Sequence, residues 1–527
     1  MRLCRALLAS FLLLASSESA IAQTDAPLRP TPQAFVPPLL TVPQVKYAVD
    51  RLDDIVEGAM ADTGVPGIAV AVVYRDEVLY ARGFGVREVG RPEPVDTDTV
   101  FQLASVSKPI ASTIVAAVVG QGRIAWDEPV RRYIPAFDLS APYVTANVTL
   151  SDLLSHRSGL YTSAGDLLED LGYDRSYILA RLDQQPLDAF RSSYNYSNFG
   201  YTAGAEAAAV AAGSSWEELA DEQLFGPLGM TRTSYRHADF LARQNRARLH
   251  VRNASGEWAA EHDRRPDPQA PAGGASGSIA DVASFLRLHL AGGTFEGRQV
   301  VDSDALAATY APHARPALPR TPLSRASFYG LGWNVSYDDR GRLEIGHAGA
   351  FYLGASTYVG LIPGEQLGIA VITNGEPIGV PEGIARTFLD IADNGRQTVD
   401  WLALFARVFA GMRAAEAAPF DYGEPPADAR TPGVLSDYVG RYDNPYYGPL
   451  TVADRNGRLS MEMGPRPEAW ELARHDGDTF TFQPIGENAV PRAGAAFERR
   501  PDGTVSRVVI DFYDRTGLGA FVRHQPQ

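Results

Sequence analysis

A proline-rich stretch close to residue 425 constrains the possible folds of this chain more than any other feature. It contains Pro419, Pro425, Pro426 and Pro432. Proline has no backbone N–H and a fixed φ, so neither a helix interior nor a central strand accommodates such a cluster. Helical and strand patterns alternate before it, whereas only strand signals follow it. The sequence therefore predicts two folding units, joined by a helix and a proline-rich linker over residues 396–432.

The unit after the linker, residues 433–527, is predicted to consist of strands. Its apolar runs are separated by turn signals such as Asn456-Gly457 and Asp502-Gly503. Short strands at this spacing are typical of a small barrel or sandwich. We expect a small all-β domain.

The unit before the linker, residues 45–395, carries both kinds of pattern. Strands are expected at 68–74, 78–84, 100–103, 331–337, 343–347, 355–362 and 367–373, the first two as a hairpin and the last four separated by Asp338-Asp339, Gly349 and Pro363-Gly364. Helices are expected at 44–60, 111–119, 203–212, 282–290 and 381–391, with another at 401–415 in the linker segment. This alternation predicts an α/β fold with an antiparallel sheet.

A Ser-x-x-Lys pair, Ser105 and Lys108, lies where a buried strand gives way to an apolar helix. Residues three apart on a helix share a face, so the hydroxyl and the amine can touch. A hydroxyl held against an amine is a nucleophile with its own base. At a helix start, free backbone N–H groups also favour a developing negative charge.

The rarity of lysine strengthens this interpretation. Lysine and arginine together number 48, and only Lys46 and Lys108 are lysines. Arginine stays protonated in proteins, whereas a buried lysine can lose its proton and act as a base. A lysine kept at position 108 therefore indicates an amine that titrates.

Two further short motifs contain groups that suit a catalytic site. In Tyr196-Ser-Asn198 a phenol can relay a proton and a carboxamide can hold a substrate amide. His347-Ala-Gly349 lies on an expected strand, where a lone histidine would by default be a surface residue. His156, in the loop after Leu154, is a further candidate, although such a histidine more commonly braces a loop through hydrogen bonds.

The first 22 residues are predicted to be a secretory signal, with Arg2 and Arg5, an apolar run over 6–15 and the cleavage site Ala20-Ile-Ala22. A proline-rich leader would follow over 23–44. The single cysteine, Cys4, would be removed with the signal, leaving no disulfide in an exported protein. We expect a periplasmic or secreted location, with no transmembrane segment because the apolar run is too short.

Charge and composition exclude several classes of partner. The net charge is −15, which argues against nucleic acids and anionic membranes. The nine histidines are scattered, so no metal site is predicted and no cofactor is expected. The oligomeric state stays open.

The three motifs, in this order, resemble those of the serine β-lactamase and penicillin-binding-protein superfamily, in the branch of class C β-lactamases, D-aminopeptidases and related esterases. The resemblance covers residues 45–395 and is supported by Leu153-Leu-Ser-His-Arg-Ser-Gly-Leu160, Phe225-Gly-Pro-Leu-Gly-Met230, and Gly273-Gly274 with Asp281. It implies an antiparallel sheet flanked by helices, plus an all-helical subdomain. The tail, with Tyr438-Val-Gly-Arg-Tyr442, is similar to the lipocalin-like barrel that some of these hydrolases append.

The resemblance also implies roles for individual residues. Ser105 would form an acyl-enzyme, with Lys108 and Tyr196 sharing general-base and general-acid duty. Asn198 would orient the substrate amide, and His347 would occupy the third motif. The backbone N–H groups of Ser105 and of Ala350, which follows Gly349, would form the oxyanion hole.

His347 departs from the pattern of penicillin-recognising members, which usually carry lysine there. A histidine is charged only part of the time near neutral pH, which weakens a β-lactamase reading. The sequence therefore predicts an exported serine peptidase acting on short peptides or amino-acid amides, including those with D-residues. An esterase on small acyl esters is the alternative, a β-lactamase is less favoured, and an inactive wall-binding or receptor module is the non-enzyme alternative.

Overall fold

The computed structural model describes residues 36–319, 321, 323–417, 422–466 and 468–525. The predicted signal, the leader up to residue 35 and Pro419 lie outside these residues. Within the described part, none of the helices is both long and apolar enough to cross a membrane.

The unit before the linker is built around a seven-stranded antiparallel sheet with the order β2-β1-β13-β12-β11-β10-β9. Its strands are β1 (Gly67–Tyr74), β2 (Glu77–Gly85), β9 (Phe328–Tyr329), β10 (Asn334–Tyr337), β11 (Leu343–Phe351), β12 (Ala355–Ile362) and β13 (Leu367–Thr373). The first hairpin is confirmed, and it turns at Arg75 and Asp76, which both have positive φ. β1, the first of these strands along the chain, pairs with β13, the last of them along the chain. The beginning and the end of this unit therefore meet within the sheet.

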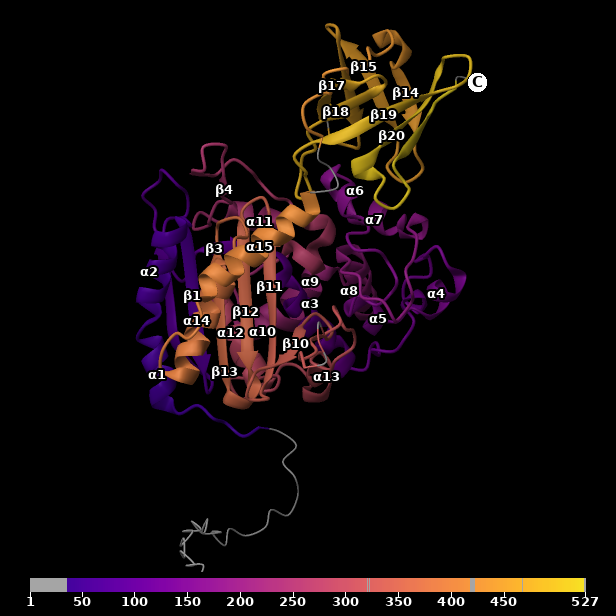
Figure 1. The fold of residues 1–527 in the computed structure, drawn as a ribbon. Coiled ribbons are helices and arrows are strands. Elements are labelled where there is room, and N and C mark those ends of the chain that lie inside the picture. Colours follow the sequence, from indigo (N-terminus) through magenta and orange to yellow (C-terminus); the bar gives the residue numbers. More distant parts are fainter. Residues whose placement is uncertain (1–35, 320, 322, 418–421, 467, 526–527) are drawn as a thin grey trace, which may run out of the picture.

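Both faces of the sheet are covered, which explains why every residue of β1 is buried. Ile68, Val70 and Val72 face a layer made by α1 (Val42–Val49), α2 (Leu52–Thr63) and α14 (Val380–Asn394). The alternate residues face the main core, where α12 (Ile279–Leu290) and α3 (Ser107–Gly120) lie. In Figure 1, α15 (Trp401–Ala417) crosses over α14 and leads toward the barrel.

Two local predictions were wrong. The helix expected over 44–60 is two helices, because Asp50 and Arg51 adopt ψ near zero and interrupt the regular hydrogen bonding between α1 and α2. The strand expected to stop before Gly349 continues to Phe351 as β11. Glycine does not break the strand there; it makes room for a neighbouring segment, as described below.

A mainly helical region lies beside the sheet. Its helices are α4 (Pro142–Asn147), α5 (Leu150–Leu154), α6 (Asp166–Asp170), α7 (Arg175–Leu179), α8 (Asn198–Ala212), α9 (Trp216–Ala220), α10 (Gly226–Leu228) and α11 (His237–Ala242), and α13 (Ser303–Ala308) packs on α3. A two-stranded sheet of β3 (Val100–Gln102) and β6 (Ser276–Ser278) leads into α3. Short pairs β4 (Val251–Arg252) with β5 (Trp258–Ala259) and β7 (Thr294–Phe295) with β8 (Arg298–Gln299) complete the unit.

The C-terminal unit is a closed barrel of eight strands. They are β14 (Gly440–Asp443), β15 (Leu450–Arg455), β16 (Arg458–Met463), β17 (Ala469–Asp476), β18 (Thr479–Phe482), β19 (Ala493–Arg499), β20 (Val505–Ile510) and β21 (Ala520–Arg523). The predicted all-β barrel is therefore confirmed, whereas its lipocalin-like character stays a prediction.

The barrel is docked firmly on the helical region, next to α6 and α7 (Figure 1). The Tyr173 hydroxyl donates to the backbone oxygen of Tyr447 at 2.8 Å. A Cβ on Gly464 would lie only 2.6 Å from the Leu171 oxygen, so the barrel backbone touches the end of α6. The buried apolar side chains of the two units form one continuous core.

Candidate active site

Ser105 lies on a sharp turn between β3 and α3. The chain leaves β3 through Ala104, which has a φ of +46°, and enters a 3₁₀ turn, Ala104–Val106, that leads directly into α3. A non-glycine residue with positive φ is strained and is held only by its surroundings. Ser105 is partly exposed, whereas its neighbours Ala104 and Val106 are buried. The turn thus presents one hydroxyl at the surface of a rigid core.

Lys108 is fully buried directly behind that hydroxyl. Its Nζ lies 3.3 Å from Ser105 Oγ, 2.7 Å from Asn198 Oδ1 and 2.9 Å from the backbone oxygen of Ala272. Burial lowers the pKa of Lys108 to about 7, and the opposing charge of Asp166 limits the shift. Near neutral pH a large fraction of this amine is therefore unprotonated and able to accept a proton.

Tyr196 and Asn198 come from the start of α8, as their motif spacing suggested. Ser197 caps this helix by accepting from the Gly200 N–H, which fixes the residues on both sides of it. The Nζ of Lys108 lies 4.4 Å from the centre of the Tyr196 ring. Burial raises the pKa of Tyr196, although a hydrogen bond with Ser105 works against that rise. The phenol thus stays protonated and touches the same hydroxyl as the amine.

His347 reaches the same cluster but is not a cation. Its Nδ1 lies 2.6 Å from the backbone oxygen of Ala348, so it donates there, and its Nε2 accepts from the Tyr329 hydroxyl at 2.9 Å. Burial and the nearby charge of Lys108 lower the pKa of His347 to about 3. The expectation of a partly charged histidine near neutral pH is therefore corrected: the ring is neutral and bound at both nitrogens.

Gly349 brings β11 against the Ser105 turn. A Cβ at this position would lie 2.4 Å from the Leu103 oxygen, 2.3 Å from Thr357 Oγ1 and 3.0 Å from the Ser105 nitrogen. Only glycine permits this approach of strand to turn. The next residue, Ala350, is exposed on β11. The backbones of Ser105 and of β11 are therefore adjacent. An oxyanion hole made by the N–H groups of Ser105 and Ala350 would require this.

Asp166 is a part of the cluster that sequence reasoning missed. It begins α6 and is buried, and its Oδ2 accepts from Asn198 Nδ2 at 3.1 Å. The Asn198 amide thus bridges Asp166 and Lys108. Burial raises the pKa of Asp166 to about 7. Its segment, Asp-Leu-Leu-Glu-Asp over residues 166–170, has the pattern of a solvated helix turn, so the sequence carried no signal of burial.

His156 braces the site rather than reacting. Its Nδ1 accepts from the Ser197 N–H at 3.2 Å, and its ring packs 4.4 Å from the Tyr196 ring, centre to centre. Burial lowers the pKa of His156 well below the usual value. The preferred interpretation of this residue as a loop brace is confirmed.

Together these groups place a hydroxyl, an amine that is largely unprotonated near neutral pH and a protonated phenol within contact of one another. Such a set can transfer acyl groups without a metal ion. Among the residues described, no cluster of histidine, cysteine, aspartate and glutamate is arranged to bind a metal.

Comparison with known families covers both units. A family model described as Beta-lactamase matches residues 52–393. A second, described as a domain of unknown function (DUF3471), matches residues 424–519. The first contains all three motifs, and the second covers the barrel from β14 to β20.

Individual relatives match different shares of the chain. Penicillin-binding protein 4 of Amycolatopsis lactamdurans is 32% identical over 330 residues, which is 62% of this chain and 83% of that protein. Unguisins hydrolase ungD' of Aspergillus campestris is 25% identical over 494 residues, covering 87% of this chain and 88% of that protein. The solved structure of an octameric penicillin-binding protein homologue from Pyrococcus abyssi matches with a TM-score of 0.58 at 19% identity, over 90% of this chain and 100% of that one. This last likeness shows a shared fold.

Proposed function

The chain belongs to the beta-lactamase family of serine hydrolases, and we propose that it is an exported peptidase that cleaves short peptides or amino-acid amides through an acyl-enzyme on Ser105. One observation carries the proposal: the Ser105 hydroxyl lies 3.3 Å from a buried lysine amine whose pKa is lowered to about 7. A base with a pKa near the working pH is the most effective one.

In the proposed reaction the neutral Lys108 amine accepts the Ser105 proton while Oγ attacks the substrate carbonyl. The N–H groups of Ser105 and Ala350 receive the negative oxygen of the tetrahedral intermediate, a contribution of about 3 kcal/mol for each such donor. Collapse breaks the C–N bond, and Tyr196, resupplied by Lys108, gives a proton to the departing amine. Water then attacks the carbonyl of the acyl-enzyme ester, and the C–Oγ bond breaks. The hydroxyl of the water stays on the released acid, and its other hydrogen returns to Ser105 Oγ.

The nature of His347 supports a peptidase over a β-lactamase. A neutral ring bound by Tyr329 and Ala348 offers no fixed positive charge to the carboxylate of a β-lactam. A relative that matches 87% of this chain is named a hydrolase of unguisins. An esterase uses the same acyl-enzyme and differs only in the leaving group, so it stays the second candidate.

Export is part of the proposal and is supported by the basic, apolar and Ala-x-Ala segments of residues 1–22. Mass analysis of the mature N-terminus after expression in a Gram-negative host would test it. Cleavage after Ala22 is expected, and an uncleaved chain would contradict export.

Labelling tests the nucleophile. A fluorophosphonate should add its mass to Ser105 in the wild type and to no residue in Ser105→Ala. Labelling that persists in the variant would contradict the mechanism.

A panel of short peptides with L- and D-residues, p-nitrophenyl esters and nitrocefin then tests the substrate class. We expect the peptides to give the highest kcat/KM, and a preference for the esters would favour the esterase.

A further inference from the structure

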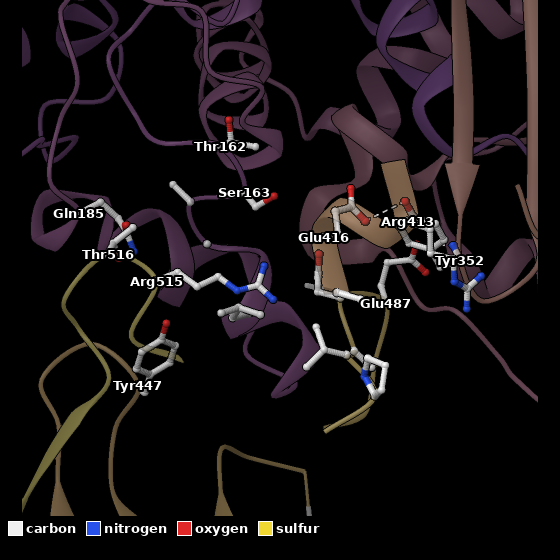
Figure 2. Close-up of a pocket in the computed structure, with 18 of the residues that line it drawn as sticks. Thr162, Ser163, Gln185, Tyr352, Arg413, Glu416, Tyr447, Glu487, Arg515 and Thr516 are labelled. Carbon is white, nitrogen blue, oxygen red and sulfur yellow. Dashed lines mark hydrogen bonds between the residues drawn. The ribbon is translucent and has the colours of Figure 1, made fainter. Parts of the chain in front are cut away.

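A cavity of about 620 Å³, called here the interface cavity, lies where the first unit, which precedes the linker, meets the barrel. One wall is the segment 162–165, just before α6. The opposite wall contains Tyr352, directly after β11, and Glu416 of α15. The barrel closes the cavity with segment 483–491, named here the barrel loop. In Figure 2, Glu487 of this loop lies beside Tyr352.

The barrel loop is bound to the turn that follows β11. One carboxyl oxygen of Glu487 accepts from the Tyr352 N–H at 2.6 Å, and the other accepts from the Leu353 N–H at 3.4 Å. Among the described residues, no backbone oxygen accepts either of these N–H groups. The turn between β11 and β12 therefore depends on a side chain of the barrel for both hydrogen bonds.

The same loop is also bound to α6. The N–H groups of Glu487 and Asn488 donate to the Asp170 carboxylate at 3.0 and 3.1 Å. The side-chain amide of Asn488 adds a third hydrogen bond to Asp170 at 2.8 Å. Because Glu487 takes part in both attachments, a single residue of the barrel connects α6 with the turn after β11.

These two elements carry groups on different sides of the active site. α6 begins with Asp166, which accepts from Asn198 at 3.1 Å, and Asn198 in turn accepts from Lys108 at 2.7 Å. β11 carries Ala350, two residues before Tyr352. The barrel loop therefore joins the helix next to the buried amine to the strand next to the Ser105 turn.

A buried arginine strengthens this junction. The guanidinium of Arg264 donates to Glu169 of α6, and its Nε lies 3.9 Å from a carboxyl oxygen of Glu487. Its guanidinium carbon lies 5.1 Å from the centre of the ring of Phe351, the last residue of β11. One cation thus contacts α6, the barrel loop and the end of β11.

The hold of Glu487 on the turn does not require a negative charge. Burial raises the pKa of Glu487 to about 8, and the charge of Arg264 works against that rise. Near neutral pH a large fraction of this carboxyl is therefore protonated. Its carbonyl oxygen still accepts an N–H in that form, so an amide of the same shape could take its place.

We propose that Glu487 of the barrel is a positioning residue of the active site. By holding the turn after β11, it fixes the position of the Ala350 N–H relative to Ser105. A misplacement of about 1 Å can cost roughly 10²-fold in rate. Glu487 acts through the backbone of Tyr352 and Leu353 and touches no reacting atom. The proposal rests on the proposed function, because it needs an acyl-enzyme on Ser105 and the Ala350 N–H as an oxyanion donor.

An ester and its thiono analogue test this role. Sulfur accepts hydrogen bonds more weakly than oxygen, so an oxyanion hole favours p-nitrophenyl butyrate over its analogue with sulfur in place of the carbonyl oxygen. Glu487→Ala should lower kcat/KM for the oxygen ester by about tenfold to a hundredfold and for the thiono ester by much less, so the ratio of the two falls. Glu487→Gln keeps an acceptor for the Tyr352 N–H and should retain most of the wild-type ratio. Glu487→Asp, whose carboxyl is one methylene short of the turn, should lower the ratio as well.

Glu498→Ala is the matched control, because Glu498 is also on the barrel but pairs with Arg507 on its exposed surface. It should behave as the wild type. A wild-type ratio in Glu487→Ala and Glu487→Asp, whether or not the overall activity falls, would overturn the positioning role. Fluorophosphonate labelling of Ser105 separates this failure from failure of the proposed function. Labelling that persists in the Glu487 variants with an unchanged ratio leaves the mechanism standing while the positioning role falls.

Discussion

The chemistry of Lys108 depends on what surrounds one amine. Its ammonium form would need water that the buried site does not supply, and three polar atoms, Ser105 Oγ, Asn198 Oδ1 and the Ala272 oxygen, accept its hydrogens instead. Desolvation dominates, so the pKa falls to about 7. Arginine at this place could not lose its proton.

Lys108→Arg is therefore expected to reduce kcat by about 10²–10⁴-fold, the usual value of general-base help. Steady-state kinetics on the best substrate would measure it. Lys46→Arg is a matched control, since the chain's other lysine is exposed on α1 and should tolerate the change. Near-normal turnover in Lys108→Arg would rule out a titrating role.

Asp166 affects the pKa of the Lys108 amine across the side chain of Asn198. Its negative charge raises the pKa of Lys108, while Glu169 and Asp170 act on Asp166 itself and raise its pKa. Because the proposed role of Lys108 needs the unprotonated amine, kcat/KM should rise with pH through about 7 and then level off. Asp166→Asn keeps an acceptor for the Asn198 amide but removes the charge, so the acid limb should move to lower pH. A uniform loss of activity with an unmoved limb would mean that Asp166 only packs.

At this scale the sequence predicted which side chains lie together and missed their environment. The spacing of Ser105 and Lys108 and the scarcity of lysine sufficed to single out the amine next to the hydroxyl. The neutrality of His347 depends on Tyr329, and the role of Asp166 depends on Asn198. These partners come from other segments of the chain, so no local pattern reports them.

Among the elements, the contact between β11 and the Ser105 turn determines whether the site is assembled. Gly349 has no room for a methyl group, because backbone atoms of Leu103 and Ser105 stand in its place. Gly349→Ala should push the strand from the turn, lower stability by about 1–3 kcal/mol through overpacking and reduce kcat by about 10²-fold through misplacement.

Thermal unfolding and kinetics would measure both effects. Gly58→Ala, inside α2 with open space around its Cα, is the control and should raise stability by about 0.5–1 kcal/mol with activity unchanged. A Gly349→Ala enzyme with wild-type kcat would show that the approach of strand to turn is not required.

The periodic patterns predicted most elements of the sheet, because alternation and turn residues are local. They failed at two places. The break between α1 and α2 falls inside a continuous helical pattern. In the sequence Gly349 indicates the end of a strand, yet β11 continues to Phe351. The turn at Ser105 packs against the side of Gly349 where a larger residue would have its Cβ.

For the whole molecule, the proline-rich linker correctly predicted two architectures, the mixed sheet unit and the all-β barrel. It could not predict that the two units share one core. Nor could it predict that the barrel loop, residues 483–491, is bound both to α6 and to the segment after β11. Those contacts join Asp170 to Asn488 and Tyr352 to Glu487, pairs that lie more than a hundred positions apart in the chain.

Asp170→Ala tests this docking. It leaves three donors of the barrel loop without their acceptor and should cost about 1–3 kcal/mol of stability. Hydrogen exchange followed by mass spectrometry should show faster exchange over 483–491. Glu471→Ala, which removes only an exposed pair with Arg458, is the control and should exchange as the wild type does. Unchanged protection in Asp170→Ala would mean that other contacts hold the loop.

The two-sided attachment of the barrel loop has a consequence for how such an enzyme diversifies. The loop is held by hydrogen bonds of main-chain N–H groups and of the side chains of Glu487, Asn488 and Asp170. The other side chains of the loop are not needed for these bonds. Substitutions at those positions, or loops grafted from other barrels, would change the lining of the interface cavity and leave the residues around Ser105 as they are. The surface beside the first unit can thus vary by mutation in the barrel alone.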